Sequence, residues 1–400
     1  MKRLIYILLI VVCSCSTTIS AQTEISITEF GEKFEILFKK IFEDYEKKDY
    51  LAGEKLTNEV ISLYNLLSKE NQENYKEIQA NMYYQLACLF SLQYKKDEAI
   101  DTLKKAIELG WKNYSHTNND SDLDNIRNDQ EFKTLLQDLR EISDYHYILM
   151  GSEGYQKADT TGLPHFTYED VSSSNLKSLR KFFNLDSIAG EGDEISQILN
   201  LLKWVHDNIR HNGNNFTFCE FDAIDLYNYC KTTGEGVNCR LLAISLNEVY
   251  LSMGFKSRYI TGMPKKLGNA HVINCVYSTT LKKWLWMDPT MNAYWRDENG
   301  NFLSIEEVRE RYIEGLPLIL NDDANWNNER KETKESYLDN WMSEYLYWFS
   351  CPINSRFNPE SPYRNDDQLY INLCPLGYER SILPNVKSIA TNDAAYFWEN

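Results

Sequence analysis

Helix-like periodicity between residues 28 and about 140 constrains the fold of this chain more than any other feature of its sequence. Apolar residues recur at spacings of three and four, for example at Phe34, Ile36, Leu37, Ile41 and Tyr45. Such spacing places them on one face of an α-helix, and glycine is rare in this stretch. The N-terminal third is therefore expected to be an array of helices rather than a sheet domain.

The order of small and large residues is sharper between residues 80 and 113. Small residues there let paired helices approach closely, and large ones fill the space between them: Tyr83, Leu86, Ala87, Phe90, Ala99, Leu103 and Ala106. This pattern resembles the tetratricopeptide repeat. Since one repeat cannot bury its own face, we expect about two and a half repeats and a closing helix within residues 22–145. The resemblance implies a protein partner for the helical repeats; a rigid spacer, or a lid packed on a second domain, is the alternative.

Residues 1–21 have the three-part pattern of a secretory signal peptide. A basic start precedes an apolar run from Leu4 to Val12, which is too short to span a bilayer, and small and polar residues continue to Ala21. Cleavage after Ala21 is favoured, and lipid attachment at Cys15 is the alternative. We therefore predict an exported protein, periplasmic or extracellular, which is a lipoprotein in the alternative case.

The composition argues against several classes of protein. A net charge of −17 opposes binding to nucleic acid and to anionic lipid. Beyond the signal, no apolar run reaches the roughly 18 residues of a membrane-spanning helix. The six histidines are scattered, no C-x-x-C pair occurs, and no aspartate-rich loop has the spacing of a calcium site. We predict no metal and no cofactor.

The cysteines that follow the signal are odd in number. They are Cys88, Cys219, Cys230, Cys239, Cys275, Cys351 and Cys374. In an oxidising compartment, at least one thiol is then free or paired with another molecule.

A second domain is expected after a looser stretch of chain. Glycine, proline and serine between residues 146 and 188 are typical of a linker. An amphipathic helix over residues 195–209 opens the core of the second domain, which we place at residues 189–320. The aromatic-rich residues 321–400 are predicted to pack on that core as an extension rather than to form a free tail.

The segment GEGVNCR at residues 234–240 is the most informative motif. It places Cys239 at the start of a helix-period segment that ends at Gly254. A helix N-terminus favours the thiolate because its unsatisfied N–H groups stabilise negative charge, and the glycines let a substrate backbone approach. Alone, this signal is weak, since an unpaired cysteine is more often a buried structural residue.

Two β-rich runs follow and supply a histidine and an aspartate. The first begins at His271, and the second ends at Asp288. If the two strands pair through the turn between them, both residues can face the start of the Cys239 helix. A thiol, an imidazole that takes and returns its proton, and a carboxylate that fixes the tautomer form a catalytic set.

The order and contexts of these residues resemble the transglutaminase-like cysteine superfamily, which is similar in chemistry to papain-type peptidases. The resemblance covers roughly residues 190–320 and identifies Cys239, His271 and Asp288 as the catalytic triad. It implies an α+β core and acyl transfer through a thioester on a peptide or carboxamide. With water as acceptor the protein is an amide hydrolase or peptidase, which we favour; with an amine it is a transamidase.

The walls of the acyl site and its second oxyanion donor are not determined by the sequence. After the histidine the family commonly has an aromatic residue and an acid, where this chain has Ile273 and Cys275. The Cys239 backbone N–H is the natural first oxyanion donor. Trp204 is a speculative second donor, although a core tryptophan is the more usual reading. Cys275 is more consistent with a buried residue than with a regulatory disulfide to Cys239.

The sequence thus predicts a multidomain protein, with an all-α helical-repeat N-terminal domain and an α+β papain/transglutaminase-like C-terminal domain. Its expected substrate is a protein or peptide. The alternative is a non-catalytic scaffold that binds a protein through its helical repeats.

Overall fold

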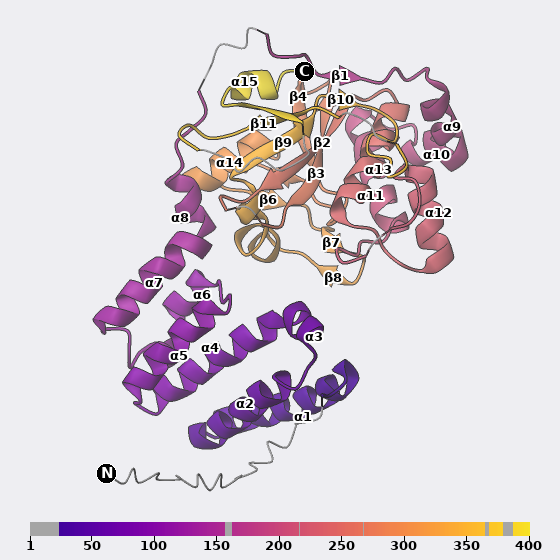
Figure 1. Ribbon diagram of the computed structural model, residues 1–400. Coiled ribbons are helices and arrows are strands. Elements are labelled where there is room, and N and C mark those ends of the chain that lie inside the picture. The colour runs from indigo at the N-terminus through magenta and orange to yellow at the C-terminus, as the bar shows by residue number, and fades with distance from the viewer. Residues whose placement is uncertain (1–23, 157–161, 216, 267, 365–367, 379–386) are drawn as a thin grey trace, which may run out of the picture. The chain divides into compact units, whose positions relative to one another are not determined.

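The computed structural model describes residues 24–156, 162–215, 217–266, 268–364, 368–378 and 387–400 (Figure 1). The predicted signal, with Cys15 and Ala21, lies outside the described residues. Contacts divide the chain into two compact units, Met1–Ser143 and Asp144–Asn400. Within the described ranges, no helix combines the length and the apolar character needed to cross a bilayer.

Residues 24–143 form helices and turns only. The elements are α1 (Ile27–Glu46), α2 (Tyr50–Tyr64), α3 (Lys69–Asn74), α4 (Lys76–Leu92), α5 (Lys96–Glu108), α6 (Tyr114–Asn119), the 3-10 helix η1 (Ser121–Leu123) and α7 (Gln130–Ser143). Helix α1 packs on α2, α2 on α4, and α4 on α5. The α4–α5 contact is close because Ala87, Ala99 and Ala106 are fully buried. The predicted helical domain is confirmed, whereas its assignment to tetratricopeptide repeats stays a prediction.

The second unit combines helices with a sheet. Its helices are α8 (Tyr145–Met150), α9 (Ser174–Phe183), α10 (Leu185–Ala189), α11 (Glu194–Asn208), α12 (Ala223–Thr233), α13 (Cys239–Ser252), α14 (Ile305–Glu314), η2 (Glu335–Asp339), η3 (Met342–Tyr345) and α15 (Ala394–Phe397). Its strands are β1 (Thr167–Tyr168), β2 (Ser257–Met263), β3 (His271–Ser278), β4 (Lys283–Met287), β5 (Trp295–Arg296), β6 (Ile319–Leu320), β7 (Asn325–Trp326), β8 (Arg330–Lys331), β9 (Trp348–Pro352), β10 (Asn354–Ser355), β11 (Tyr370–Leu373) and β12 (Ser388–Thr391).

Six of these strands form the central sheet, in the order β12-β11-β9-β2-β3-β4. All neighbours are antiparallel except β11 and β12, which are parallel. Strand β9 pairs with β2, so the predicted C-terminal extension continues the sheet that begins in the core. The extension is therefore an integral part of the second unit.

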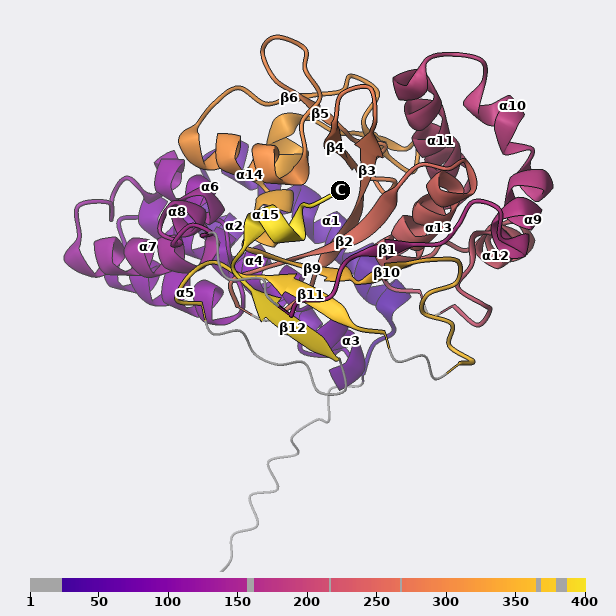
Figure 2. The same ribbon diagram turned by 90° about the horizontal axis from the view of Figure 1, so that it is seen from above.

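Apolar cores cover both faces of this sheet. Tyr259, Val272 and Val276 point toward α9–α13, while Ile260 and Ile273 point toward α14 and the extension. Figure 2 shows α9–α13 gathered on one side of the strands and α14 and α15 on the other. Because alternate residues enter different cores, the central strands are apolar on both faces. The predicted class, an all-α helical domain followed by an α+β papain/transglutaminase-like domain, is confirmed.

Helices α9 and α10 lie within the stretch for which the sequence predicts a linker. Their residues Leu179, Phe183 and Leu185 pack in the same core as α11 and α13. Glycines and serines do mark loops before residue 174, but α9 has only 10 residues, too few for a clear periodic signal.

Candidate active site

Helix α13 begins at Cys239, and the local sequence explains why. The Asn238 side chain accepts a hydrogen bond of 3.1 Å from the Leu241 N–H and caps the helix. All residues from Leu241 to Ser252 are buried, so the helix is fixed in the core. Cys239 is half-buried at its first position, where unpaired helix N–H groups favour a thiolate.

Strands β3 and β4 bring the candidate histidine and aspartate together. They pair antiparallel, with Asn274 opposite Met287, so Asp288 directly follows the paired region. His271 Nε2 lies 2.8 Å from Asp288 Oδ2, and both side chains are buried. The other ring nitrogen, Nδ1, is left for the Cys239 thiol, whose interaction with His271 raises the pKa of the imidazole.

Asp288 has further donors that the sequence did not reveal. The Tyr337 hydroxyl donates to Oδ2 at 2.7 Å, and the Thr290 N–H donates to Oδ1 at 2.8 Å. Trp341 also covers His271, with ring centroids 4.5 Å apart. Tyr337 and Trp341 both belong to the extension, which therefore positions the Asp288–His271 pair.

Replacing Tyr337 with phenylalanine is expected to lower the free energy of unfolding by about 1.5–3 kcal/mol, because a fully buried carboxylate loses a donor. Urea denaturation measures this change. Tyr347→Phe is the control, since no hydrogen bond to the Tyr347 hydroxyl occurs within the described residues and this tyrosine is also buried. Equal losses in the two variants would contradict a positioning role for the Tyr337 hydroxyl.

His211, a second histidine at the thiol, was missed in the sequence. Its side chain lies close enough to Cys239 to lower the pKa of the thiol. Two backbone hydrogen bonds of 2.8 Å each join the residues on either side of His211 to Val237. The Val237 N–H donates to the Arg210 carbonyl oxygen, and the Asn212 N–H donates to the Val237 carbonyl oxygen. His211 thus lies beside the chain that enters α13.

The hairpin β7–β8 fixes both the backbone and the ring of His211. Asn327 accepts from the His211 N–H at 2.9 Å and donates to its carbonyl oxygen at 3.0 Å. Trp326 Nε1 donates to His211 Nδ1 at 3.0 Å. Because Nδ1 accepts that bond, the proton of a neutral ring is on Nε2. His211 therefore presents an N–H donor to the thiol.

The charges of the site favour a thiolate beside an imidazolium. Burial alone would raise the pKa of Cys239, but hydrogen bonds from His211 and His271 and the charge of His271 lower it to about 5. Burial opposes the charged form of His271, yet Asp288 and the Cys239 thiolate raise its pKa to about 10. The His271 charge likewise outweighs burial and keeps the pKa of Asp288 below its usual range. Such a pair is a pre-activated nucleophile.

Trp204 and Cys275 lie in cores and take no part in this arrangement. The Trp204 ring packs 4.6 Å from Phe183 and stacks with Tyr227, so it belongs to the core on the α9–α13 side. Cys275 is fully buried among the residues of the opposite core, and both it and Cys239 are free thiols. The structure agrees with the interpretation of both as core residues.

Two sequence families match parts of the chain. Residues 183–289 match the transglutaminase-like superfamily, and residues 52–145 match a family described as the A/B hydrolase-like, N-terminal domain. No curated protein gives a significant match.

A solved structure also matches part of the chain. It is that of a candidate cysteine protease from Cytophaga hutchinsonii, with 18% sequence identity and a TM-score of 0.24. The match covers 38% of this chain and 49% of that protein, so the chain spans about half the length of the structure it matches. Residues 183–289, which contain Cys239, His271 and Asp288, are a transglutaminase-like domain, and a helical domain precedes them in this chain.

Proposed function

We propose that this protein is an exported cysteine-dependent enzyme that hydrolyses an amide bond of a peptide or a carboxamide side chain. Cys239 is the nucleophile, His271 the acid and base, and Asp288 the residue that orients His271. The observation that carries the proposal is the position of Cys239 at the start of α13, beside a buried His271 that is held by Asp288 at 2.8 Å. The transglutaminase-like family match supports it.

The reaction follows from the protonation states of the pair. Cys239 Sγ attacks the carbonyl carbon, and the carbonyl oxygen becomes an oxyanion. The C–N bond then breaks as His271 Nδ1 gives its proton to the leaving amine, which leaves a thioester on Cys239. Water attacks the thioester and loses a proton to His271, and the acid product departs as Cys239 returns to the thiolate. An amine in place of water would give transamidation.

His211 and His271 have different roles in this proposal. Asp288 favours the imidazolium of His271, whereas the Trp326 N–H would oppose a proton on Nδ1 of His211. His211 is therefore assigned as an N–H donor and not as the base. Its Nε2–H and the Cys239 backbone N–H are the two donors that we assign to the oxyanion.

Replacing His211 with alanine is expected to slow acylation of Cys239 by p-nitrophenyl acetate about 100- to 1,000-fold, the usual effect of losing one oxyanion donor. Alkylation by iodoacetamide forms no oxyanion. At a pH where Cys239 is fully ionised in each variant, alkylation therefore changes much less. The p-nitrophenolate burst and peptide mass spectrometry measure the two rates.

His211→Gln, which keeps a side-chain N–H, is the matched control and is expected to recover part of the acylation rate. A parallel fall of acylation and alkylation would mean that His211 acts only on the ionisation of the thiol. That result would remove His211 from the oxyanion site while leaving the triad intact.

A mixture of peptides with known sequences tests the proposed reaction as a whole. The wild-type chain and Cys239→Ala are incubated with it, and mass spectrometry records new N-termini, conversion of glutamine to glutamate, and isopeptide cross-links. Cys239-dependent hydrolysis supports the proposal, and Cys239-dependent cross-links would establish an amine acceptor. No Cys239-dependent product, together with slow alkylation of Cys239 at neutral pH, would leave a non-catalytic scaffold.

A further inference from the structure

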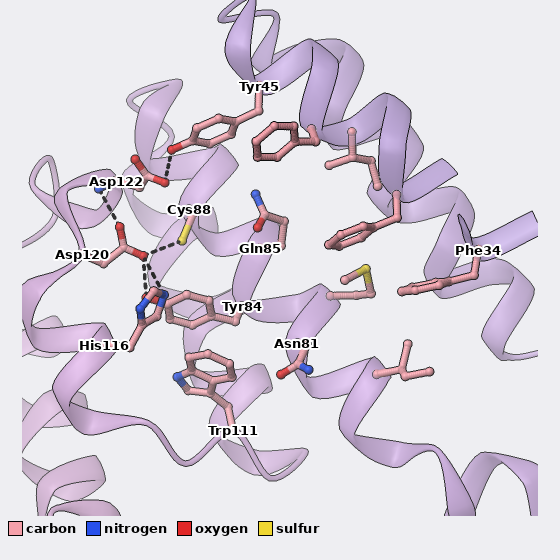
Figure 3. A pocket seen from close by; sticks show the side chains of 15 residues that line it. Phe34, Tyr45, Asn81, Tyr84, Gln85, Cys88, Trp111, His116, Asp120 and Asp122 are labelled. Carbon is pink, nitrogen blue, oxygen red and sulfur yellow. Dashed lines mark hydrogen bonds and ion pairs between the residues drawn. The ribbon is translucent and has the colours of Figure 1, made fainter. Parts of the chain in front are cut away.

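The helical unit contains a cavity of about 490 Å³ that the proposed reaction does not use (Figure 3). Its lining comes from α1, from α4 and from the segment between Trp111 and Asp122. All of these residues belong to the first unit, so the cavity is a property of that unit alone.

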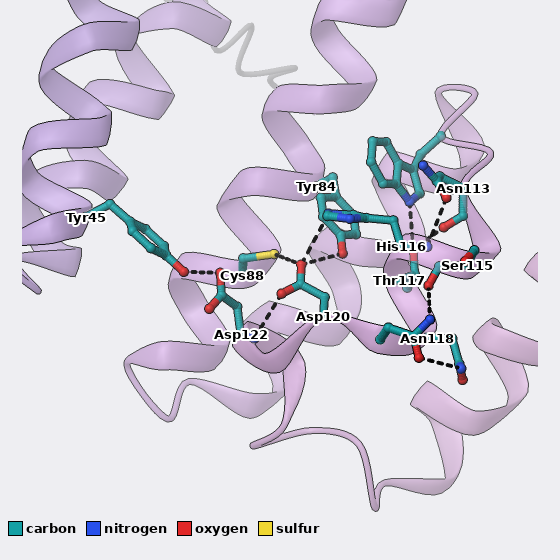
Figure 4. A network of polar contacts seen from close by, with 12 residues as sticks. Tyr45, Tyr84, Cys88, Asn113, Ser115, His116, Thr117, Asn118, Asp120 and Asp122 are labelled. Carbon is teal, nitrogen blue, oxygen red and sulfur yellow. Dashed lines mark hydrogen bonds and ion pairs between the residues drawn. The ribbon is translucent and has the colours of Figure 1, made fainter. Parts of the chain in front are cut away.

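One end of the cavity is acidic. Asp120 Oδ2 accepts hydrogen bonds from the Tyr84 hydroxyl at 2.7 Å and from the Cys88 thiol at 3.6 Å, and the Tyr45 hydroxyl donates to Asp122 (Figure 4). Oxygen atoms of both carboxylates and the Cys88 sulfur lie within 4.8 Å of one another. Neutral donors thus surround two carboxylates.

No lysine or arginine of the first unit's described residues lines the cavity. His116 Nε2 lies 3.5 Å from Asp120 Oδ2 and is charged only when it is protonated. Arg127 donates instead to the backbone oxygens of Asn118 and Asp120 and pairs with Asp124. The negative charge at this end is therefore not matched by a permanent cation in the lining.

The remaining walls are aromatic and amide-bearing. Phe38 and Phe42 of α1 line the cavity although they are 48% and 61% exposed, and Trp111 stacks on Tyr84 with ring centroids 3.9 Å apart. The side-chain amides of Asn81 and Gln85 are drawn between these walls (Figure 3), and neither makes a hydrogen bond in the described part of the chain.

We infer that this cavity binds a lysine or arginine side chain presented by a peptide, with the charged end at Asp120 and Asp122. The aliphatic stem lies against the aromatic wall, where it buries apolar surface and gains cation–π attraction. Asn81 and Gln85 each offer a donor and an acceptor to the peptide groups beside that side chain. This binding is independent of the chemistry at Cys239.

A metal ion fits the same cluster less well. Cys88, Asp120 and Asp122 are the metal-type side chains that meet in the described residues, but a metal would have to displace the tyrosine hydroxyls from both carboxylates. It would also need Cys88 as a thiolate, and burial holds the pKa of that thiol well above its usual range. An ammonium or guanidinium group needs neither change, and a metal would leave the aromatic walls without a role.

Fluorescence anisotropy with short labelled peptides tests this inference on the full chain. Four pentapeptides share phenylalanine on both sides of a central lysine, arginine, norleucine or glutamate. We expect the lysine and arginine peptides to bind about tenfold or more tightly than norleucine, which has a similar stem and no charge. Their binding is expected to weaken as salt is added, because the carboxylates are partly exposed to solvent.

Variants place the binding within the cavity. Asp122→Asn and Phe42→Ala are expected to reduce lysine-peptide binding about tenfold or more, while Asp124→Asn, which removes the same charge outside the lining, leaves it unchanged. Cys239→Ala is also expected to bind normally, so failure of the enzyme proposal does not affect this test. Equal binding of norleucine and lysine, binding of none of the four peptides, or Asp122-dependent binding of Zn²⁺ that excludes the lysine peptide would each overturn the inference.

Discussion

Replacing His271 with alanine is expected to move the midpoint of Cys239 alkylation from about pH 5 up toward or beyond the ordinary thiol value of about 8.5. Because the wild-type pKa is lowered, the thiolate is present above pH 5 and is lost as the pH falls through that value. The variant loses both the charge and the hydrogen bond of His271, while burial still raises the pKa. At pH 7 we expect alkylation to slow about 30-fold or more.

The measurement is the rate of iodoacetamide labelling as a function of pH, followed peptide by peptide with mass spectrometry. Cys219 is an internal reference in the same molecule. It is half-buried like Cys239, but burial and nearby aspartates raise its pKa to about 11. Labelling of Cys239 at the rate of Cys219 at pH 7, or indifference to the His271 change, would refute the activated thiolate.

The largest effect on stability is expected from Gly236→Ala. A Cβ at this position would lie 2.6 Å from the His211 carbonyl carbon and 2.7 Å from the Asn212 nitrogen. These are backbone atoms that cannot rotate away, so the segment beside Val237 must move. We expect the free energy of unfolding to fall by about 2–4 kcal/mol, measured by urea denaturation.

Gly213→Ala is the matched control, because its Cβ would meet nothing nearer than 3.7 Å. Displacement of His211 also predicts a higher midpoint of Cys239 alkylation in Gly236→Ala, since one donor to the thiolate is withdrawn. If the two glycine variants had equal stability, Gly236 would not be required for the close approach of residues 210–212.

Local sequence patterns predicted much of the architecture. The 3.6-residue periodicity before residue 140 predicted helices because each helix buries one face, and the structure confirms a helical first unit. The helix-period segment that ends at Gly254 predicted a helix start at Cys239, where α13 begins. The roles of Cys239, His271 and Asp288, the domain boundaries and the signal peptide stay predictions.

The residues that contact the candidate triad from other parts of the chain could not be predicted from local sequence patterns. Trp326 and Tyr337 contact His211 and Asp288 across 115 and 49 residues of chain, respectively. No short spacing connects such positions, because tertiary packing and not a helix or strand period sets their distance. His211 lies shortly after the end of α11, and no sequence motif around it indicates a functional role.

The place of β9 between β2 and β11 has a consequence for how the molecule is assembled. Residues 239–288 leave the ribosome well before Trp326, Tyr337 and the strand at Trp348–Pro352. Until those residues follow, the outer edge of β2 has no partner and offers unpaired backbone groups to other chains. A nascent chain that ends near residue 320 would therefore carry the whole candidate triad without its supports. Such a fragment is expected to be inactive and prone to aggregation, so reactivity at Cys239 arises only when synthesis is nearly finished.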